Sequence, residues 1–375
     1  MCCYAWPLRL LLFALFYSFG TSPALCQAGR RRAEVSASGK RFEGPFHLVA
    51  TPVRQVQVIV TETMQSPALD ALQWGIVAAQ APSYAGQTIL ESQFSIPGVR
   101  AARVQSCTDR SPLRQGYWLA TYPVTREEQR ARATAQSVYR ALLYARVLTP
   151  GADTVAVKPL TGDERFLYLT ASNVTNYATL GFRRWLRQAD LLRRTQERDL
   201  DFAYRALEYI AQNFRYHWVQ GSSTDPADVV NRGESHCTGI ANLYIATLRA
   251  SGIPARLAVG RRIVNSSSPQ AMVTNGALTI DPGTAHVAAE FYAEGVGWVP
   301  VEPTCALGAA DVTPFFGRSD GSLLVMHFDS MWLDTRTRNL QGMEWDYGRW
   351  RGSWNGRHLS DTMQVQPTAV SSTTP

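Results

Sequence analysis

The stretch Cys237-Thr-Gly-Ile-Ala-Asn-Leu-Tyr-Ile-Ala-Thr-Leu-Arg-Ala-Ser-Gly-Ile-Pro-Ala-Arg256 decides the fold of this chain. Its apolar residues recur at helical spacing as far as Ala250, and Gly252 followed by Pro254 ends the predicted helix. Cys237 is then the first helical residue, where unpaired N–H groups and the positive end of the helix dipole favour a thiolate. The stretch therefore predicts a reactive cysteine at a helix start, with a buried packing cysteine as the alternative.

A histidine and a carboxylate follow in a predicted β-hairpin. Strands are expected at residues 286–292 and 296–301, joined by a three-residue loop at 293–295 that contains a glycine. This closure pairs residue 292 with 296 and therefore His286 with Glu302, whose Cβ atoms would lie about 4.5–5.5 Å apart. Glu290 shares the face of His286 but lies roughly 13 Å along the strand. Glu302 is therefore the expected partner of His286.

Thiol, imidazole and carboxylate are the three parts of an activated thiol nucleophile. Cys237 is expected to attack, His286 to carry the proton, and Glu302 to orient the imidazole. A metal site that uses His236, Cys237 and His286 is the rival, but adjacent residues rarely point at one ion and no C-x-x-C or H-x-x-x-H spacing supports it. We expect no metal and no cofactor, and nothing in the chain suggests a calcium loop.

These blocks together resemble the transglutaminase-like superfamily, in particular its exported bacterial cysteine peptidases. Residues 237–256 are similar to the nucleophile helix with its Arg-x-x-Gly-Ile-Pro-Ala-Arg ending, and His286-Val-Ala-Ala-Glu-Phe-Tyr is similar to the histidine strand. Gly297-Trp-Val-Pro-Val-Glu-Pro-Thr304 resembles the Gly-Trp-x-x-x-Asp-Pro-Thr strand. The resemblance spans residues 165–320 and implies an α+β papain-like core, with Cys237 as nucleophile, His286 as general base and then acid, and Glu302 in the usual aspartate position. The extra methylene of Glu302 is the departure from the pattern.

An export signal is expected at residues 1–28. Arg9 precedes an apolar run over residues 10–19, and the small residues around positions 24–28 predict cleavage near residues 26–28. The apolar run is shorter than the roughly 20 residues that a membrane span needs, although an uncleaved anchor is the alternative. We therefore expect a secreted or periplasmic protein with no membrane span after signal cleavage.

The rest of the chain is long enough for two domains. A linker at residues 29–44 leads to a β-rich N-terminal domain at 45–124, whose short strands between turn residues are typical of a β-sandwich. The catalytic domain is expected at 125–359, and the polar tail at 360–375 is expected to be disordered. Three helices are predicted to precede Cys237, at residues 125–147, 176–188 and 196–214.

Signal cleavage would leave three cysteines, and a Cys107–Cys305 bridge would keep Cys237 free. The net charge of +7 is modest, and the arginines at 183–198 are interpreted as a solvated helix face. No aromatic interleaving argues for nucleic acid. The expected partner is a peptide or protein substrate, with a cell-envelope peptide as one candidate.

The predicted reaction proceeds through a Cys237 acyl-thioester formed from a peptide or side-chain amide. Hydrolysis by a cysteine peptidase or amidase is favoured. The alternatives are a protein-glutamine acyltransferase that forms crosslinks, and a non-catalytic binding or assembly protein that keeps the fold. The oxyanion donor is expected to be the Cys237 backbone N–H or a side chain from residues 216–220.

Overall fold

A computed structural model describes residues 41–65, 73–98, 102–123, 132–151, 157–172, 175–218, 223–263, 271–274, 277–280, 285–329, 331–332, 344–345 and 357–368. The expected export signal and residues 29–40 of the linker lie outside these ranges. None of the helices in the described ranges is both long and apolar enough to cross a membrane.

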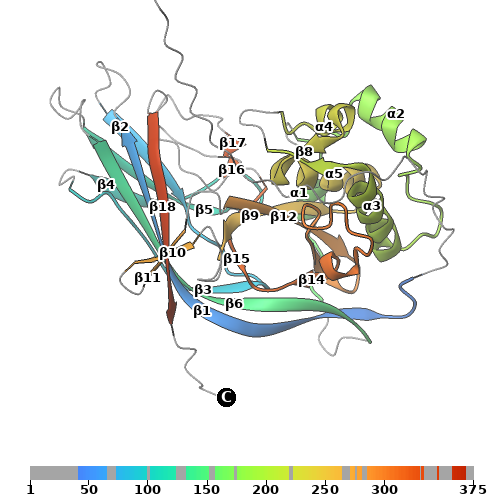
Figure 1. The fold of residues 1–375 in the computed structure, drawn as a ribbon, viewed down its shortest axis with the longest axis horizontal. Helices are drawn as coiled ribbons and strands as arrows, with labels where there is room; N and C mark the ends of the chain where they lie inside the picture. The colour runs from blue at the N-terminus through green and yellow to red at the C-terminus, as the bar shows by residue number, and fades with distance from the viewer. Residues whose placement is uncertain are drawn as a thin grey trace, which may run out of the picture. The chain divides into compact units, whose positions relative to one another are not determined.

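Two long antiparallel strands form the base of the fold. β1 (Phe46–Gln65) and β6 (Arg132–Pro150) pair along their whole length and run side by side in Figure 1. They belong to a seven-stranded sheet, here called the platform sheet, whose other members are β3 (Gln87–Ser95), β14 (Arg318–Ser319), β18 (Arg357–Thr368), β11 (Ala277–Ile280) and β10 (Ala271–Thr274). The platform sheet therefore takes strands from both ends of the described chain.

A second sheet covers part of the platform. It contains β2 (Gln73–Ala79), β5 (Gly116–Pro123) and β4 (Arg103–Thr108). Alternate residues of β1, among them Val56 and Val58, are buried in one cluster with Ile76 of β2 and Tyr117 of β5. This period of two is the burial pattern of strands with one face on a core. The predicted β-rich N-terminal region is confirmed.

The helix predicted at residues 125–147 is wrong, because residues 132–150 form β6. Their Ala, Arg and Leu content favours a helix locally. The buried residues nevertheless alternate, from Ala135 through Tyr139 to Leu143, and β1 supplies hydrogen-bond partners along the whole strand. Tertiary pairing therefore overrides helix propensity here.

The tail predicted to be disordered from residue 360 is also wrong as far as Thr368. Residues 357–368 form β18, which pairs antiparallel with the edge of β1 that β6 leaves open, for example Val58 with Val365. The strand is mostly polar, and the hydrogen-bonding edge of β1 explains why such a sequence is ordered. Residues 369–375 lie outside the described ranges.

A four-stranded sheet, here called the catalytic sheet, carries the residues singled out by the sequence. Its order is β13 (Gly297–Val301), β12 (Ala285–Ala293), β9 (Ala255–Arg262) and β15 (Leu323–Phe328). One face, with Val287 and Phe291, packs in a core cluster with α3 (Asp199–Asn213) and α5 (Cys237–Ala250). The other face, with Ala258 and Ala288, packs near Tyr84. Because both faces are covered, the strands are buried almost continuously. The predicted α+β class and the predicted bounds of α5 are confirmed.

Three shorter helices complete the helical side of the catalytic sheet: α1 (Gly162–Leu169), α2 (Leu180–Gln188) and α4 (Pro226–Arg232). α4 ends at Gly233, whose φ of 70° is left-handed. β8 (Glu234–Ser235) follows and pairs in parallel with β7 (Arg215–Tyr216), and His236 then leads directly into α5. The short segments β16 (Met331–Trp332), β17 (Glu344–Trp345) and a 3-10 turn at Thr313–Phe315 are the remaining described elements.

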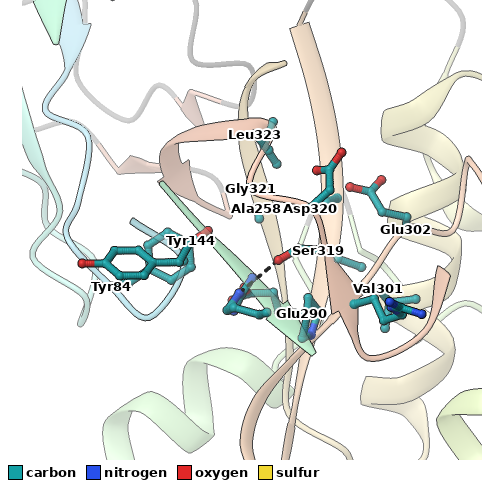
Figure 2. A pocket seen from close by; sticks show the side chains of 16 residues that line it. Tyr84, Tyr144, Ala258, Glu290, Val301, Glu302, Ser319, Asp320, Gly321 and Leu323 are labelled. Carbon is teal, nitrogen blue, oxygen red and sulfur yellow. Dashed lines mark hydrogen bonds and ion pairs between the residues drawn. The ribbon is translucent and has the colours of Figure 1, made fainter. Parts of the chain in front are cut away.

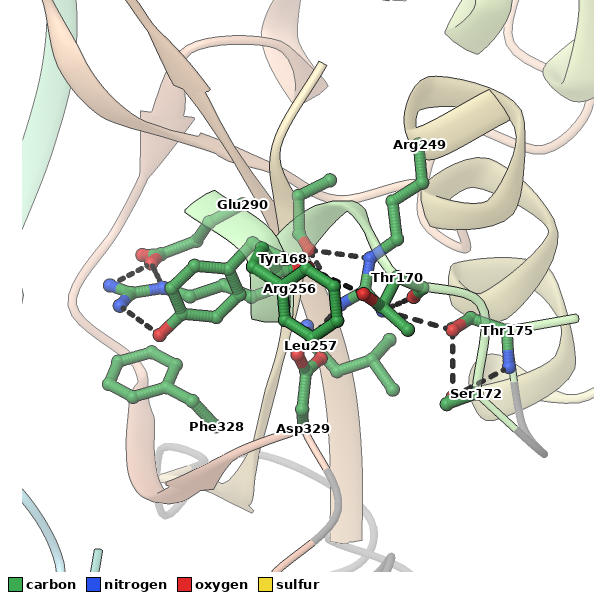
Figure 3. A network of polar contacts seen from close by, with 12 residues as sticks. Tyr168, Thr170, Ser172, Thr175, Arg249, Arg256, Leu257, Glu290, Phe328 and Asp329 are labelled. Carbon is green, nitrogen blue, oxygen red and sulfur yellow. Dashed lines mark hydrogen bonds and ion pairs between the residues drawn. The ribbon is translucent and has the colours of Figure 1, made fainter. Parts of the chain in front are cut away.

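The two arginines of the Arg-x-x-Gly-Ile-Pro-Ala-Arg ending hold the link from α5 to β9 (Figure 3). Arg249 donates to the carbonyl of Ala255, at 2.9 and 2.7 Å, and pairs with Asp329 at 2.7 Å. Arg256 lies between aromatic rings, 3.9 Å from the centre of the Trp298 ring and 3.6 Å from that of Phe328. Trp298, which is half-buried, thus packs its ring against the Arg256 guanidinium.

Glu290 joins the catalytic sheet to the platform sheet. Its carboxylate accepts from Arg256 of β9 at 2.7 and 2.9 Å and from Arg146 of β6 on its other oxygen. All three side chains are less than a tenth exposed. Burial alone would raise the pKa of Glu290, but the two guanidinium groups outweigh it and lower the pKa. Glu290 is therefore a structural charge, which explains why it is not the partner of His286.

Candidate active site

The hairpin that carries His286 has a register two residues away from the predicted one. The turn is formed by residues 294–296, and Ala293 pairs with Gly297, Tyr292 with Trp298. Gly295 and Gly297 both have positive φ, 75° and 94°, so the chain can reverse one residue later than predicted. A shift of two leaves every side chain on its expected face. The predicted direct pairing of His286 with Glu302 is wrong, although their predicted proximity is not.

Glu302 reaches the imidazole diagonally. β13 ends at Val301, and the next residue, Glu302, donates its N–H to the carbonyl of Phe315 at 2.9 Å. From there Glu302 Oε2 lies 2.7 Å from His286 Nε2. Diagonal neighbours in a hairpin are farther apart than direct pairs, and only long side chains span the gap. The extra methylene of glutamate suits this reach.

Cys237 begins α5, as predicted. His236 before it has an extended backbone and makes no side-chain cap, so the first N–H groups of the helix are not capped by that side chain. Burial would raise the pKa of the thiol, but interactions with His236 and His286 outweigh it and lower the pKa to about 6. Cys237 therefore carries substantial thiolate at neutral pH.

His286 has the opposite shift. Burial lowers the pKa of an imidazole, but the Glu302 carboxylate and the Cys237 thiol together raise the pKa of His286 to about 9. Because Nε2 faces Glu302, Nδ1 is the nitrogen left for Cys237. A thiol near 6 beside an imidazole near 9 forms a thiolate–imidazolium pair between those values.

Residues 216–218 lie beside the nucleophile. β7 and β8 hold this segment, since Tyr216 pairs with Ser235 and His217 donates its N–H to the carbonyl of Ser235 at 3.0 Å. Burial and the charge of Cys237 both raise the pKa of Tyr216. Tyr216 and Trp218 are exposed aromatic residues, 52% and 62% accessible. Residues 219 and 220 of the expected oxyanion segment lie outside the described ranges.

Two further residues surround His286: Arg262, which the sequence did not single out, and Cys305, which the sequence offered only as a disulfide partner of Cys107. Arg262, the last residue of β9, places Nη2 at 3.2 Å from His286 Nε2 and 3.4 Å from Cys305 Sγ. Cys305 lies three residues after Glu302, and burial first and the Glu302 charge second raise the pKa of its thiol. The position of Cys305 three residues after Glu302 could have placed it near His286 from the sequence alone. No sequence signal could have placed Arg262 there. Cys237 and Cys305 are both free thiols, so the Cys107–Cys305 bridge is not formed.

The donor atoms of His286, Glu302 and Cys305 lie within 4.8 Å of one another, a set that could hold a metal ion. Such N, O and S donors suit zinc. Arg262 Nη2 lies among them, 3.6 Å from Glu302 Oε2. A guanidinium in this place repels a metal cation. These three residues also differ from the metal site considered from the sequence, which used His236, Cys237 and His286.

A pocket partly open to solvent is lined by residues of both the catalytic sheet and the platform sheet, and it encloses about 410 Å³ of space with open solvent included. Figure 2 shows Glu302 and Asp320 on one side of it and Tyr84 on the other. Arg146 of β6 also lines this pocket, but Cys237 is not among its described lining residues. The pocket therefore gives access to the carboxylate of the cluster and not to the thiol.

Comparisons with known proteins identify this arrangement. The family model of the transglutaminase-like superfamily matches residues 187–303, which include Cys237, His286 and Glu302. Residues 187–303 are a transglutaminase-like superfamily domain. This transglutaminase-like domain contains α3, α5 and the His286 hairpin, so its fold fits a cysteine-protease-like or transglutaminase-like activity. No curated protein sequence is found to match the chain.

One solved structure shares the fold over most of this chain. A candidate cysteine protease from Cytophaga hutchinsonii superposes with a TM-score of 0.54 at 15% identity, covering 86% of this chain and 93% of that one. The periplasmic domain of TgpA from Pseudomonas aeruginosa gives a TM-score of 0.35 at 17% identity, covering 69% and 93%. At 15% identity the likeness to the Cytophaga hutchinsonii protein concerns the fold alone.

Proposed function

We propose that this protein is an exported thiol hydrolase that acts on peptide or side-chain amide bonds through a Cys237 acyl-thioester. The observation that carries the proposal is the Cys237–His286–Glu302 cluster, in which the thiol pKa of about 6 lies below the imidazole pKa of about 9. That order supplies both a nucleophile and a proton donor at neutral pH.

In the proposed reaction the Cys237 thiolate attacks the amide carbonyl, and the C–S bond forms as the carbonyl oxygen becomes an oxyanion. The Cys237 N–H at the start of α5 is one donor for that oxyanion, and the Tyr216 hydroxyl is a second. The His286 imidazolium gives its proton to the departing amine as the C–N bond breaks, which leaves the thioester. Neutral His286 then takes a proton from water as the water oxygen attacks the thioester carbonyl. The C–S bond breaks, the carboxylic acid leaves, and the thiolate–imidazolium pair is restored.

Export is proposed from residues 1–28, where the short positive segment, apolar run and small residues are typical of a cleaved signal. Fractionation of cells that express the full chain tests this. A product outside the cytoplasm that begins near residues 26–28 supports export, and full-length protein in the cytoplasm contradicts it.

The reaction is tested with peptides that contain both glutamine and lysine, incubated with and without an added primary amine and examined by mass spectrometry. Hydrolysis predicts cleaved or deamidated peptide in both cases. Crosslinking or amine incorporation instead indicates acyl transfer, the alternative. Cys237→Ala must abolish either product, while Cys107→Ser on β4 is the matched thiol control. Intact peptide with wild-type protein, together with an inert Cys237, indicates a non-catalytic protein.

A further inference from the structure

Arg262 lies among the polar groups around His286. Its Nη2 is 3.2 Å from His286 Nε2, 3.6 Å from Glu302 Oε2 and 3.4 Å from Cys305 Sγ. These three atoms lie within 4.8 Å of one another. The guanidinium of Arg262 is thus the cation that this cluster already contains.

The position of the imidazole proton decides how Arg262 acts. Nε2 lies 2.7 Å from Glu302 Oε2, so its proton is donated to that carboxylate. A nitrogen that carries a proton cannot accept one from Arg262. The contact between Arg262 and His286 is therefore an approach of two groups that are both positive when the imidazole is protonated. Arg262 attracts Glu302 and repels the imidazolium.

We propose that Arg262 is a positioning residue of the proposed active site: it shares the Glu302 carboxylate with His286 and weakens the hold of that carboxylate on the imidazolium. The inference rests on the proposed function, since a weaker carboxylate–imidazolium interaction helps the reaction when the imidazolium protonates a leaving amine. Without a neighbouring cation, a buried imidazolium bound to a carboxylate is a weak acid and gives up its proton slowly.

The other charged and titratable groups around the pair are few in the described part of the chain. His286 faces Glu302, Cys237, Arg262 and Cys305. The Arg262 charge lowers the pKa of His286, in the same direction as burial. Arg262 itself faces Glu302, Cys305 and Asp320; burial lowers its pKa, but these groups outweigh burial and raise it. Arg262 therefore stays charged wherever the His286 imidazolium exists.

The experiment measures the pKa of His286 directly, in protein labelled with ¹³C-histidine. The chain has six histidines, and loss of one signal in His286→Ala assigns the resonance. Arg262→Gln and Arg262→Met, two neutral side chains of similar length, are expected to raise the pKa of His286 by about one unit, the low end for one neighbouring charge. Arg262→Lys keeps a charge and is expected to shift it less. Arg183→Gln, an exposed arginine of α2, is the control for net charge and should leave it unchanged.

A second readout is the pH dependence of Cys237 alkylation by iodoacetamide. The upper transition of the alkylation rate follows the pKa of His286, so it should move to higher pH in Arg262→Gln and Arg262→Met. The lower transition follows the pKa of Cys237 and should move less. If the pKa of His286 is unchanged in a folded neutral variant, the proposed role of Arg262 is overturned. Two neutral variants are used so that the test can still be made if one of them does not fold. If Cys237 of the wild type is inert, the proposed function is overturned instead, and the NMR titration still decides whether Arg262 acts on His286.

Discussion

At the scale of single residues, the chemistry depends on which of two neighbouring groups holds the proton. Cys237 interacts with His236 and His286, so its charged form is favoured despite burial. His286 gains Glu302 at 2.7 Å, so its charged form is favoured too. Each partner stabilises the charge of the other, and the pair becomes ionic at neutral pH.

The first prediction concerns the pH window of this pair. Alkylation of Cys237 should increase as pH rises through about 6, where the thiolate forms, and change again near 9, where His286 loses its proton. Glu302→Gln removes the charge that raises the His286 pKa, so the upper transition of the alkylation profile should move to lower pH by about one to three pH units. Amide cleavage should fall on the order of 10²–10⁴-fold, as for a lost acid–base group.

Two variants sharpen that test. Glu302→Asp keeps the negative charge but has a shorter side chain for the diagonal contact. Its upper alkylation transition should therefore occur at a pH between those of wild type and Glu302→Gln. Glu294→Gln changes an exposed carboxylate in the same hairpin and should leave the profile unchanged. A Glu302→Gln profile that matches wild type would contradict the assigned role of this carboxylate.

At the scale of elements, β9 holds the hairpin in place. Gly260 pairs with His286 on one side and with Val325 of β15 on the other. A Cβ at Gly260 would lie 2.0 Å from the carbonyl oxygen of Leu324, so no side chain fits without moving the β15 backbone. The position of the strand that carries His286 therefore depends on a glycine in its neighbour.

The second prediction follows from this contact. Gly260→Ala should lower the free energy of unfolding by about 1–3 kcal/mol, as overpacking does, and should also slow Cys237 alkylation because β12 shifts with β9. Urea denaturation and iodoacetamide labelling measure the two effects. Gly181→Ala in α2, where a Cβ meets nothing within 4 Å, is the control. It should be neutral or stabilising by up to about 1 kcal/mol; an equal loss in both variants would contradict the argument.

At the scale of the whole molecule, a buried charge network joins the platform sheet to the catalytic sheet. Glu290 of β12 binds Arg256 of β9 and Arg146 of β6. The sequence separations are long, so this contact forms only when both sheets are in place. Its role is to fix one sheet against the other, since a buried ion network is strongly destabilising when one partner is removed.

The third prediction is that Glu290→Gln lowers the free energy of unfolding by about 3–5 kcal/mol, because it leaves two buried guanidinium groups without a counter-charge. Glu91→Gln is the matched control, since Glu91 pairs with Arg140 of the same strand β6 at 3.8 Å but at the surface. It should cost at most about 1 kcal/mol. Chemical denaturation at neutral pH compares the two variants.

The pH dependence of stability checks the same network. The folded pKa of Glu290 lies below its unfolded value, so its contribution to stability is present above the unfolded pKa. That contribution is lost as pH falls through the folded pKa. Wild-type protein should therefore lose stability on acidification more steeply than Glu290→Gln, and parallel curves would contradict the paired state of Glu290.

Local signals were enough to predict α5, the hairpin strands and the order of thiol, imidazole and carboxylate. Helical periodicity up to Ala250, the Gly252–Pro254 stop and the glycines of the turn act within a few residues, so no tertiary information is needed to read them. The face of each hairpin residue also follows, because side chains alternate with a period of two.

Only the folded chain decided the rest. A period of two cannot distinguish registers that differ by two residues, which is why the direct His286–Glu302 pairing was wrong while their contact was found. Residues 132–150 have helical composition, yet β1 and its hydrogen bonds make them a strand. Arg262 lies 24 residues before His286 and 43 residues before Cys305 in the sequence. Local sequence does not predict the contacts of Arg262, because their energy comes from charges that meet only after the strands of the catalytic sheet have paired.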